Sequence, residues 1–167
     1  QNSRKPKIIV MIPAYNEGEN VAHLVQSILD NQKFELVKLA EIIVVSDGST
    51  DNTVEELRKI KFQKLRIIDS KVRRGKAFRQ NQMFRLAVGE IAVIFDADIV
   101  ITDQTCIEKL VQPIINQKAD MTSSAIYELP TSTYFEQVLD VSMRLKRVLF
   151  ANLKKGNNVY NCHGPAR

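Results

Sequence analysis

The sequence predicts an α/β fold in which helices flank a central, mostly parallel β-sheet. Apolar, β-branched runs of strand length alternate with longer stretches whose apolar residues recur at helical spacing. Polar and charged residues suited to ligand binding follow directly after several of these runs. Strands that alternate with helices are joined by right-handed crossovers, which place them side by side in one parallel sheet.

The first half of the chain carries three predicted strands, over residues 7–12, 41–46 and 65–69. Pro13 is expected to end the first strand, because proline cannot donate to a sheet. Asn20 is expected to open a helix whose apolar face comprises Val21, Leu24, Val25, Ile28 and Leu29. His23 lies beside that face, and we predict a surface histidine.

Two further helices are expected before the fourth strand. Asp51 or Asn52 can cap a short helix that carries Val54, Leu57 and Ile60. A basic loop, residues 71–76 (Lys-Val-Arg-Arg-Gly-Lys), opens a helix that runs to about residue 88. We expect this loop to be mobile until an anionic ligand orders it; a solvated basic turn is the alternative.

The second half begins with a run over residues 91–95 that predicts a strand buried on both faces. The expected elements after it are a helix over about 106–115, a strand over 121–127, a long amphipathic helix over 133–155 and a last strand over 159–162. No linker divides these elements, so residues 7–167 are expected to form one domain after a disordered tail, residues 1–6.

Two carboxylates, Asp96 and Asp98, follow the strand over 91–95. In an extended chain this spacing points both side chains the same way. Two like charges at one place need a positive partner, and a divalent cation that also binds phosphate oxygens would supply it. The alternative is a solvated loop whose carboxylates cap the next helix.

The composition limits the functional classes. The chain has 167 residues, 44% hydrophobic and 26% charged, with a net charge of +5, which is too mild a basic balance to indicate nucleic acid. An anionic ligand or a membrane surface is compatible with it. Only Cys106 and Cys162 could pair, which favours a reducing, cytoplasmic compartment, and no apolar run approaches the roughly 20 residues of a bilayer span.

The polar residues that follow the predicted strands are expected to meet at one edge of the sheet, because parallel strands end there together. Tyr15 and Glu17 follow the first strand, Asp47 follows the second, and the basic loop follows the third. An aromatic ring and carboxylates suit a nucleobase and ribose, whereas basic side chains suit a diphosphate. Asp47 alone could equally shape an Asx turn.

Four motifs in order carry a family resemblance: Ile-Pro-Ala-Tyr-Asn-Glu at 12–17, Val-Ser-Asp-Gly-Ser-Thr-Asp-Asn-Thr at 45–53, Gly-Lys-Ala at 75–77 and Phe-Asp-Ala-Asp at 95–98. Together they resemble the donor-binding half of the inverting family 2 glycosyltransferases, the group with dolichyl-phosphate mannose synthases and cellulose-synthase-like enzymes. The resemblance covers about residues 7–101. It implies the nucleotide-diphospho-sugar transferase fold, called GT-A, with the start of an acceptor half over 102–167.

The resemblance also implies roles for individual residues. Pro13, Ala14, Tyr15 and Glu17 would line the nucleobase pocket, Asp47 would hold the base, and Lys76 would lie near the diphosphate. Asp96, Ala97 and Asp98 match the Asp-X-Asp motif. Asp96 and Asp98 would bind Mg²⁺ or Mn²⁺, with Asp98 as the expected direct ligand.

The implied reaction is a metal-dependent, inverting transfer of a sugar from a UDP- or GDP-sugar to a saccharide or lipid-linked acceptor. Inversion needs a general base, which such enzymes place after a Gly-rich acceptor segment. Residues 161–167 resemble the start of that segment, so the base is expected beyond Arg167 and this chain is expected to be a part that lacks it. His163 could face the acceptor or make a structural hydrogen bond, and the chain has no Trp for a Gln-X-X-Arg-Trp motif.

Other functions fit less of the sequence. A nucleotide-sugar-binding module without turnover shares every donor feature. A haloacid-dehalogenase-like phosphatase would use Asp96 as its nucleophile, but it usually carries that residue on its first strand. The Gly-X-Gly-X-X-Gly motif of dinucleotide-binding oxidoreductases is absent after the first strand.

The long helix over 133–155 has two interpretations. Its apolar residues Val138, Val141, Leu145, Val148 and Leu149 most simply pack on the sheet. Basic residues flank them in the second half of the helix: Arg144, Lys146, Arg147, Lys154 and Lys155. That combination is also typical of a helix lying on an anionic membrane surface, so a peripheral membrane contact is the alternative.

Overall fold

The computed structural model describes residues 4–124, 133, 141–142, 145 and 148. The chain divides into two compact units, Gln1–Lys118 and Ala119–Arg167. Almost all of the described structure belongs to the first unit, which contains every element named below.

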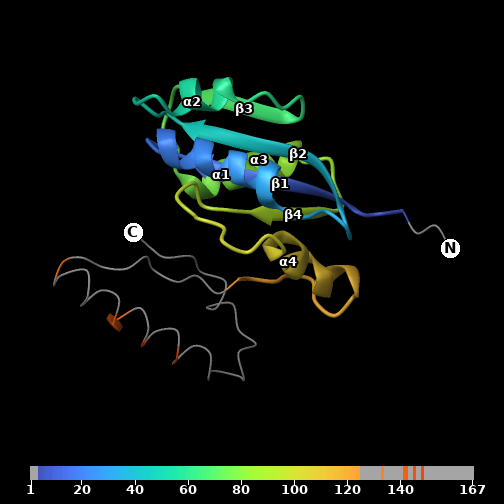
Figure 1. The fold of residues 1–167 in the computed structure, drawn as a ribbon. Coiled ribbons are helices and arrows are strands. Elements are labelled where there is room, and N and C mark those ends of the chain that lie inside the picture. The colour runs from blue at the N-terminus through green and yellow to red at the C-terminus, as the bar shows by residue number, and fades with distance from the viewer. Residues whose placement is uncertain (1–3, 125–132, 134–140, 143–144, 146–147, 149–167) are drawn as a thin grey trace. The chain divides into compact units, whose positions relative to one another are not determined.

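The first unit is a four-stranded parallel sheet with helices on both faces (Figure 1). The strands lie in the order β3-β2-β1-β4, so the chain starts in the middle of the sheet and builds outward on both sides. The strands are β1 (Lys7–Ala14), β2 (Lys38–Asp47), β3 (Leu65–Ser70) and β4 (Ile91–Ile94). The helices are α1 (Gly18–Asn31), α2 (Thr53–Lys59), α3 (Lys76–Leu86) and α4 (Cys106–Ile115).

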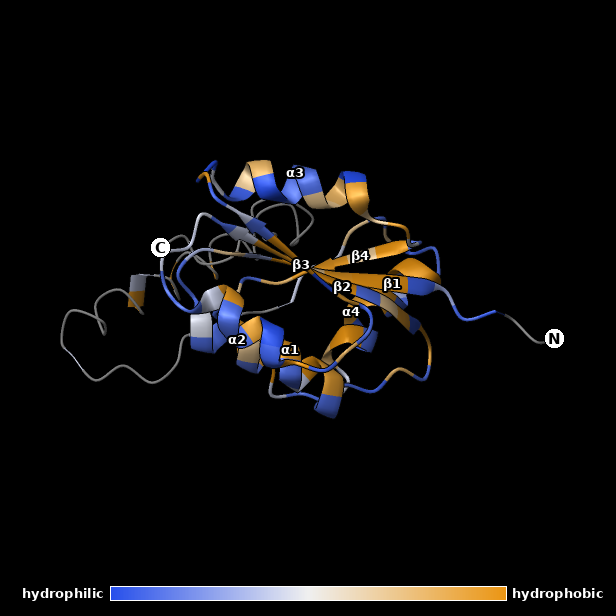
Figure 2. Ribbon diagram, turned by 90° about the horizontal axis from the view of Figure 1, so that it is seen from above, coloured by the Kyte–Doolittle hydropathy of each residue, from blue (hydrophilic) through white to orange (hydrophobic). Residues whose placement is uncertain are grey.

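The apolar residues of β1 alternate between two cores. Ile8, Val10 and Ile12 belong to the larger core, which also contains apolar residues of α1, α2 and α4. Ile9 and Met11 lie in the smaller core with residues of β2 and with Met83 of α3. Figure 2 accordingly shows α3 on one face of the sheet and the other three helices on the opposite face. Because β1 is covered on both faces, its sequence is a continuous apolar run.

The predicted fold class is confirmed, and α4 has the predicted bounds. Pro13 does not end β1: it pairs in register with Val45, and Ala14 pairs with Ser46. Helix α1 begins at Gly18, earlier than the predicted Asn20. The cause is a tertiary cap, because Asp51 Oδ2 accepts the Gly18 N–H at 3.2 Å and thereby satisfies a first-turn donor. His23 is exposed, as predicted.

The prediction that the strand after residue 90 is buried on both faces was wrong. Within the described sheet β4 pairs only with β1, and Val93 is buried while Ala92 and Ile94 are exposed. Ala92 and Ile94 are in register with Ile9 and Met11, on the face that carries α3. That helix packs over β1 and β2, so it leaves this face of β4 open.

Several predictions concern the ends of the chain. Pro6 O accepts a hydrogen bond from the Lys38 N–H, so the part of the predicted tail next to β1 is held against β2. Residues 121–124 are not in a strand; the rest of the strand predicted over 121–127, and the last strand over 159–162, lie outside the described residues.

Four residues of the predicted long helix, 141, 142, 145 and 148, are helical, whereas Thr133, its predicted first residue, lies in a bend; its other residues lie outside the described part of the chain. Cys106 is a free, half-buried thiol, and Cys162 is not among the described residues. In the described part of the chain, no helix combines the length and apolar character needed to cross a bilayer.

Candidate functional site

The four parallel strands end at one edge of the sheet, which we call the carboxyl edge. The residues predicted from the sequence to form the site all lie at or just beyond these strand ends: Pro13, Ala14, Tyr15, Glu17, Asp47, Lys76, Asp96, Ala97 and Asp98. Open α/β sheets bind ligands at this edge, because loops from several strands converge there. Hydrogen bonds, an ion pair and a cation–π contact link these loops to one another.

The loop after β1 and the loop after β2 are joined by hydrogen bonds. Asn16 Oδ1 accepts the Thr50 N–H at 2.8 Å, and Ser49 Oγ accepts the Asn16 N–H at 3.1 Å. Asn16 has a φ of 53°, a left-handed conformation that asparagine tolerates better than most residues. Thr53 Oγ1 accepts the Glu17 N–H at 3.1 Å. Hydrogen bonds of the two residues after Tyr15 therefore join the loop after β1 to the segment between β2 and α2.

Asp47, the last residue of β2, is only 4% exposed. Its carboxylate accepts hydrogen bonds from the Arg74 N–H at 2.8 Å, the Gly75 N–H at 2.7 Å and Arg79 Nε at 2.7 Å. Burial raises the pKa of Asp47, but these three donors outweigh burial and hold the pKa below its ordinary value. Asp47 is therefore ionised at neutral pH and anchors the backbone of the basic loop.

The backbone of the basic loop is anchored in this structure, and the mobility expected without ligand stays a prediction. Gly75 supplies the required conformation, with a φ of 90° that a side chain would disfavour. The role of Asp47 in holding a base stays a prediction. Its contacts add a second role, in positioning the loop, that the sequence motif did not indicate.

Arg79 is the residue of this site that sequence reasoning missed. It lies in α3, is 4% exposed, and pairs with Asp47 across 32 positions of sequence. Its remaining nitrogens donate to Val72 O and to Gln82 Oε1. The available signal was weak: Arg79 precedes the buried Met83 by four residues, on the face of α3 that meets the sheet.

Two side chains of the basic loop, those of Arg73 and Lys76, contact residues of the predicted site. The Arg73 guanidinium lies over the Tyr15 ring, 3.9 Å from its centroid, a cation–π geometry. Tyr15 remains 37% exposed. Lys76 Nζ lies 2.5 Å from Asp96 Oδ1, and these side chains are 53% and 22% exposed. One loop thus reaches both the aromatic and the acidic part of the carboxyl edge.

The alternation argument assumed an extended backbone from Asp96 to Asp98, but the chain turns there. Strand β4 ends at Ile94, and Asp96 O accepts a hydrogen bond from the Ile99 N–H at 3.3 Å, so residues 96–99 form a turn. The last bond from this segment to β1 is the one from the Phe95 N–H to Met11 O, at 3.1 Å, and the turn begins at the next residue. Ala97, which separates the two aspartates in sequence, is buried, and Asp96 and Asp98 are both half-buried.

The donor set at Asp96 and Asp98 suits a hard divalent cation only in part. The described residues contain no group of three or more His, Cys, Asp or Glu side chains arranged to hold a metal ion. Two carboxylates nevertheless match the way Mg²⁺ is bound beside phosphates, with water and substrate oxygens as the other ligands. The residues therefore fit a cation that arrives with a phosphate ligand.

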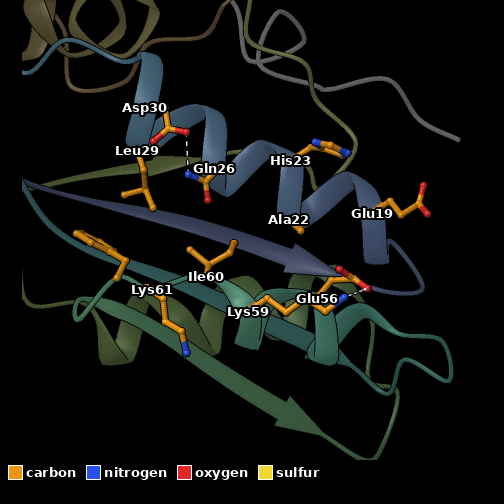
Figure 3. Close-up of a pocket in the computed structure, with 11 residues that line it drawn as sticks. Glu19, Ala22, His23, Gln26, Leu29, Asp30, Glu56, Lys59, Ile60 and Lys61 are labelled. Atoms are coloured by element: carbon orange, nitrogen blue, oxygen red, sulfur yellow. Dashed lines mark hydrogen bonds and ion pairs between the residues drawn. The ribbon is translucent and has the colours of Figure 1, made fainter.

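A separate groove lies between α1 and the segment around α2, with a volume of about 950 Å³ (Figure 3). It is lined by mixed charges, including Glu19, Asp30 and Lys59, and by apolar side chains such as Leu29 and Ile60. None of the residues predicted for the site lines it. Its presence therefore adds nothing to the chemistry of the carboxyl edge.

The parallel sheet with helices on both faces has the GT-A fold of glycosyltransferases, as its similarity to solved structures shows. A mannosyltransferase from Pyrobaculum calidifontis, in complex with GDP-Man and Mn²⁺, has a TM-score of 0.56 and 28% identity, over 82% of this chain and 39% of its own. Glucosyl-3-phosphoglycerate synthase from Mycobacterium tuberculosis, solved with Mn²⁺ and UDP, has a TM-score of 0.61 and 23% identity, over 90% of this chain and 51% of its own.

The family model described as Glycosyl transferase family 2 matches residues 9–166, so the chain belongs to glycosyl transferase family 2. A poly-beta-1,6-N-acetyl-D-glucosamine synthase from Staphylococcus epidermidis is 36% identical over 97 residues, which are 58% of this chain and 23% of that protein. Glycosyltransferase GlyG from Streptococcus pneumoniae is 32% identical over 127 residues, 75% of this chain and 40% of that protein. The chain thus spans less than half of these relatives.

Proposed function

We propose that this chain is the donor-binding part of a glycosyltransferase that uses a UDP- or GDP-sugar. The observation that carries the proposal is the linked set of contacts at the carboxyl edge, in which one basic loop reaches Tyr15, Asp47 and Asp96. An aromatic ring, an acidic pair and flexible cations are the groups that a base, a metal and a diphosphate require. Membership of family 2 favours this function over a phosphatase with Asp96 as nucleophile.

Each part of the donor has a proposed partner. The base lies against Pro13, Ala14, Tyr15 and Glu17, with Asp47 as a hydrogen-bond acceptor. Lys76 exchanges its contact with Asp96 for the diphosphate, since a cation is attracted to whichever anion is nearer and more charged. Asp96 and Asp98, with Ala97 between them, hold Mg²⁺ or Mn²⁺, which when bound neutralises charge on the departing diphosphate.

The remaining features complete the proposal. Residues 7–101 form the donor half, and residues 102–167 begin an acceptor half whose general base lies beyond Arg167. Transfer inverts the anomeric centre, the acceptor is a saccharide or a lipid-linked hydroxyl or phosphate, and the enzyme acts on the cytoplasmic side, in contact with the membrane surface. Within family 2, the proposed group is the one with dolichyl-phosphate mannose synthases and cellulose-synthase-like enzymes.

The test is calorimetric titration of the chain with UDP and GDP, with and without Mn²⁺. We expect Mn²⁺ to tighten binding, and Asp98→Ala to remove that gain, because the substitution deletes an oxygen ligand. Asp30→Ala is the matched control, since Asp30 is an exposed carboxylate near the far end of α1. Equal metal-dependent affinity in Asp98→Ala and in the parent chain would overturn the assignment.

A further inference from the structure

One buried guanidinium determines how the basic loop is held. Arg79 donates through Nε to Asp47 Oδ1, while its terminal nitrogens reach Val72 O and Gln82 Oε1. The same Oδ1 also accepts the Arg74 N–H, and Oδ2 of this carboxylate accepts the Gly75 N–H. A single ion pair thus bonds to both ends of the segment from Val72 to Gly75, and it fixes the backbone between them.

Burying this ion pair costs desolvation free energy, so stability alone does not account for it. The side chains of Arg79 and Asp47 are 5% and 6% exposed, so both charges have lost most of their water. Burying an ion pair commonly contributes no more stability than apolar side chains of the same size would. The geometry of the pair is nevertheless specific, because the N–H groups of the planar guanidinium donate in fixed directions.

Two of the three cations in or next to the fixed segment reach the predicted donor site, while the guanidinium of the third, Arg74, lies over the Phe78 ring. Arg73, between Val72 and Arg74, lies over Tyr15, and Lys76, directly after Gly75, pairs with Asp96. Neither contact involves Arg79. Any shift of the segment would nevertheless displace both side chains, since each lies one residue from an anchored backbone group.

We propose that Arg79 is a positioning residue for donor binding, which acts through Asp47 and the backbone of the basic loop to aim Arg73 and Lys76 at the nucleotide diphosphate. The inference rests on the function proposed above. It makes no claim that Arg79 contacts the donor. It distinguishes Arg79 from an ordinary core ion pair, whose loss would lower stability without changing the affinity of the folded protein.

The experiment compares Arg79→Lys, Gln82→Ala and the control Arg85→Lys in the full chain. A lysine keeps the charge but cannot reach Asp47 and Val72 O together. Gln82→Ala removes only one partner of Arg79, so this variant should fold. Arg85 is exposed in the last turn of α3 and makes the control a matched substitution. The readouts are amide hydrogen exchange over residues 72–76 and titration with UDP and uridine, in the presence of Mn²⁺ and well below each melting temperature.

We expect Arg79→Lys to speed exchange at Arg74 and Gly75 and to weaken UDP by about tenfold, the loss of roughly one charge-assisted hydrogen bond, with a smaller effect on uridine. Gln82→Ala should act in the same direction but less, and Arg85→Lys should match the parent. Parental loop protection together with parental UDP affinity in a folded Arg79→Lys variant would overturn the proposal. If the parent chain bound no nucleotide, that result would contradict the proposed function. The exchange data would then still show whether Arg79 holds the loop.

Discussion

Asp47 illustrates how much one side chain can carry at this site. From the sequence it is one member of an Asp-Gly-Ser turn, with a predicted role at the base. In the fold it is a buried acceptor for two backbone N–H groups and one guanidinium. Because those donors stabilise only the ionised form, the conformation of the basic loop is linked to the protonation of this carboxyl group.

That linkage predicts the pH range in which Asp47 stabilises the fold. The folded pKa is lowered, so the contribution is fully present above the ordinary aspartate pKa, about 3.9, and is lost as the pH falls through the folded value. Asp47→Asn should cost about 3 kcal/mol at pH 7, because it leaves Arg79 buried without its counter-ion. Urea unfolding of both proteins from pH 7 to pH 2.5 should show this difference constant down to about pH 4 and shrinking below it. A difference that grew on acidification would contradict the assignment.

At the scale of elements, α1 and α2 begin at one shared carboxylate, which is local to α2 and distant in sequence from α1. Asp51 Oδ2 accepts the Gly18 N–H of α1, while its Oδ1 accepts the Thr53 N–H of α2 at 3.1 Å. Burial raises the pKa of Asp51, but its bonds from Thr53 and Gly18 hold that pKa below its ordinary value. One carboxylate thus caps two helices and fixes the spacing of the loops that carry Tyr15 and Asp47.

Asp51→Ala should therefore lower the free energy of unfolding by about 1–2 kcal/mol, the cost of a lost helix cap. Asn52→Ala is the control: Asn52 occupies the N-cap position of α2, yet its side chain makes no capping hydrogen bond. Urea unfolding at pH 7 measures both. Equal losses in the two variants would show that Asp51 has no special part in joining the helices.

The order of elements was accessible from the sequence because strand and helix periodicity are local properties. Strands β1, β2 and β3 and helix α4 lie where apolar spacing placed them. The environment of β4 was not accessible, because the exposure of Ala92 and Ile94 depends on which helix covers that face. Likewise, no local pattern could indicate that Asp51 caps a helix 33 residues earlier.

At the scale of the whole molecule, the question is where the protein works. The net charge is +5, and the basic residues of the predicted long helix belong to the second unit and all lie outside the described residues. Clustered lysine and arginine beside apolar residues attract anionic lipid, by about 1 kcal/mol for each basic residue near the surface. A lipid-linked acceptor would make such attachment useful.

We accordingly expect the chain to sediment with vesicles containing phosphatidylserine at low salt and to dissociate as salt rises, because the attraction is screened. Lys146→Glu combined with Arg147→Glu should weaken this binding. Lys61→Glu combined with Lys64→Glu, at exposed positions of the first unit, is the charge-matched control. Vesicle binding that was absent at every salt concentration would leave the helix a packing role only and favour a soluble acceptor.

The sequence by itself determined the α/β class, the family and the residues gathered at the carboxyl edge. These could be predicted because strand periodicity and short motifs depend only on residues that are close together in the chain. The tertiary structure alone decided how those residues are held: Arg79 on Asp47, Lys76 on Asp96, Arg73 over Tyr15, and the turn that follows β4. These contacts join segments that are distant in the chain. Their geometry depends on burial and on the packing of α3 against the sheet, which no local pattern encodes.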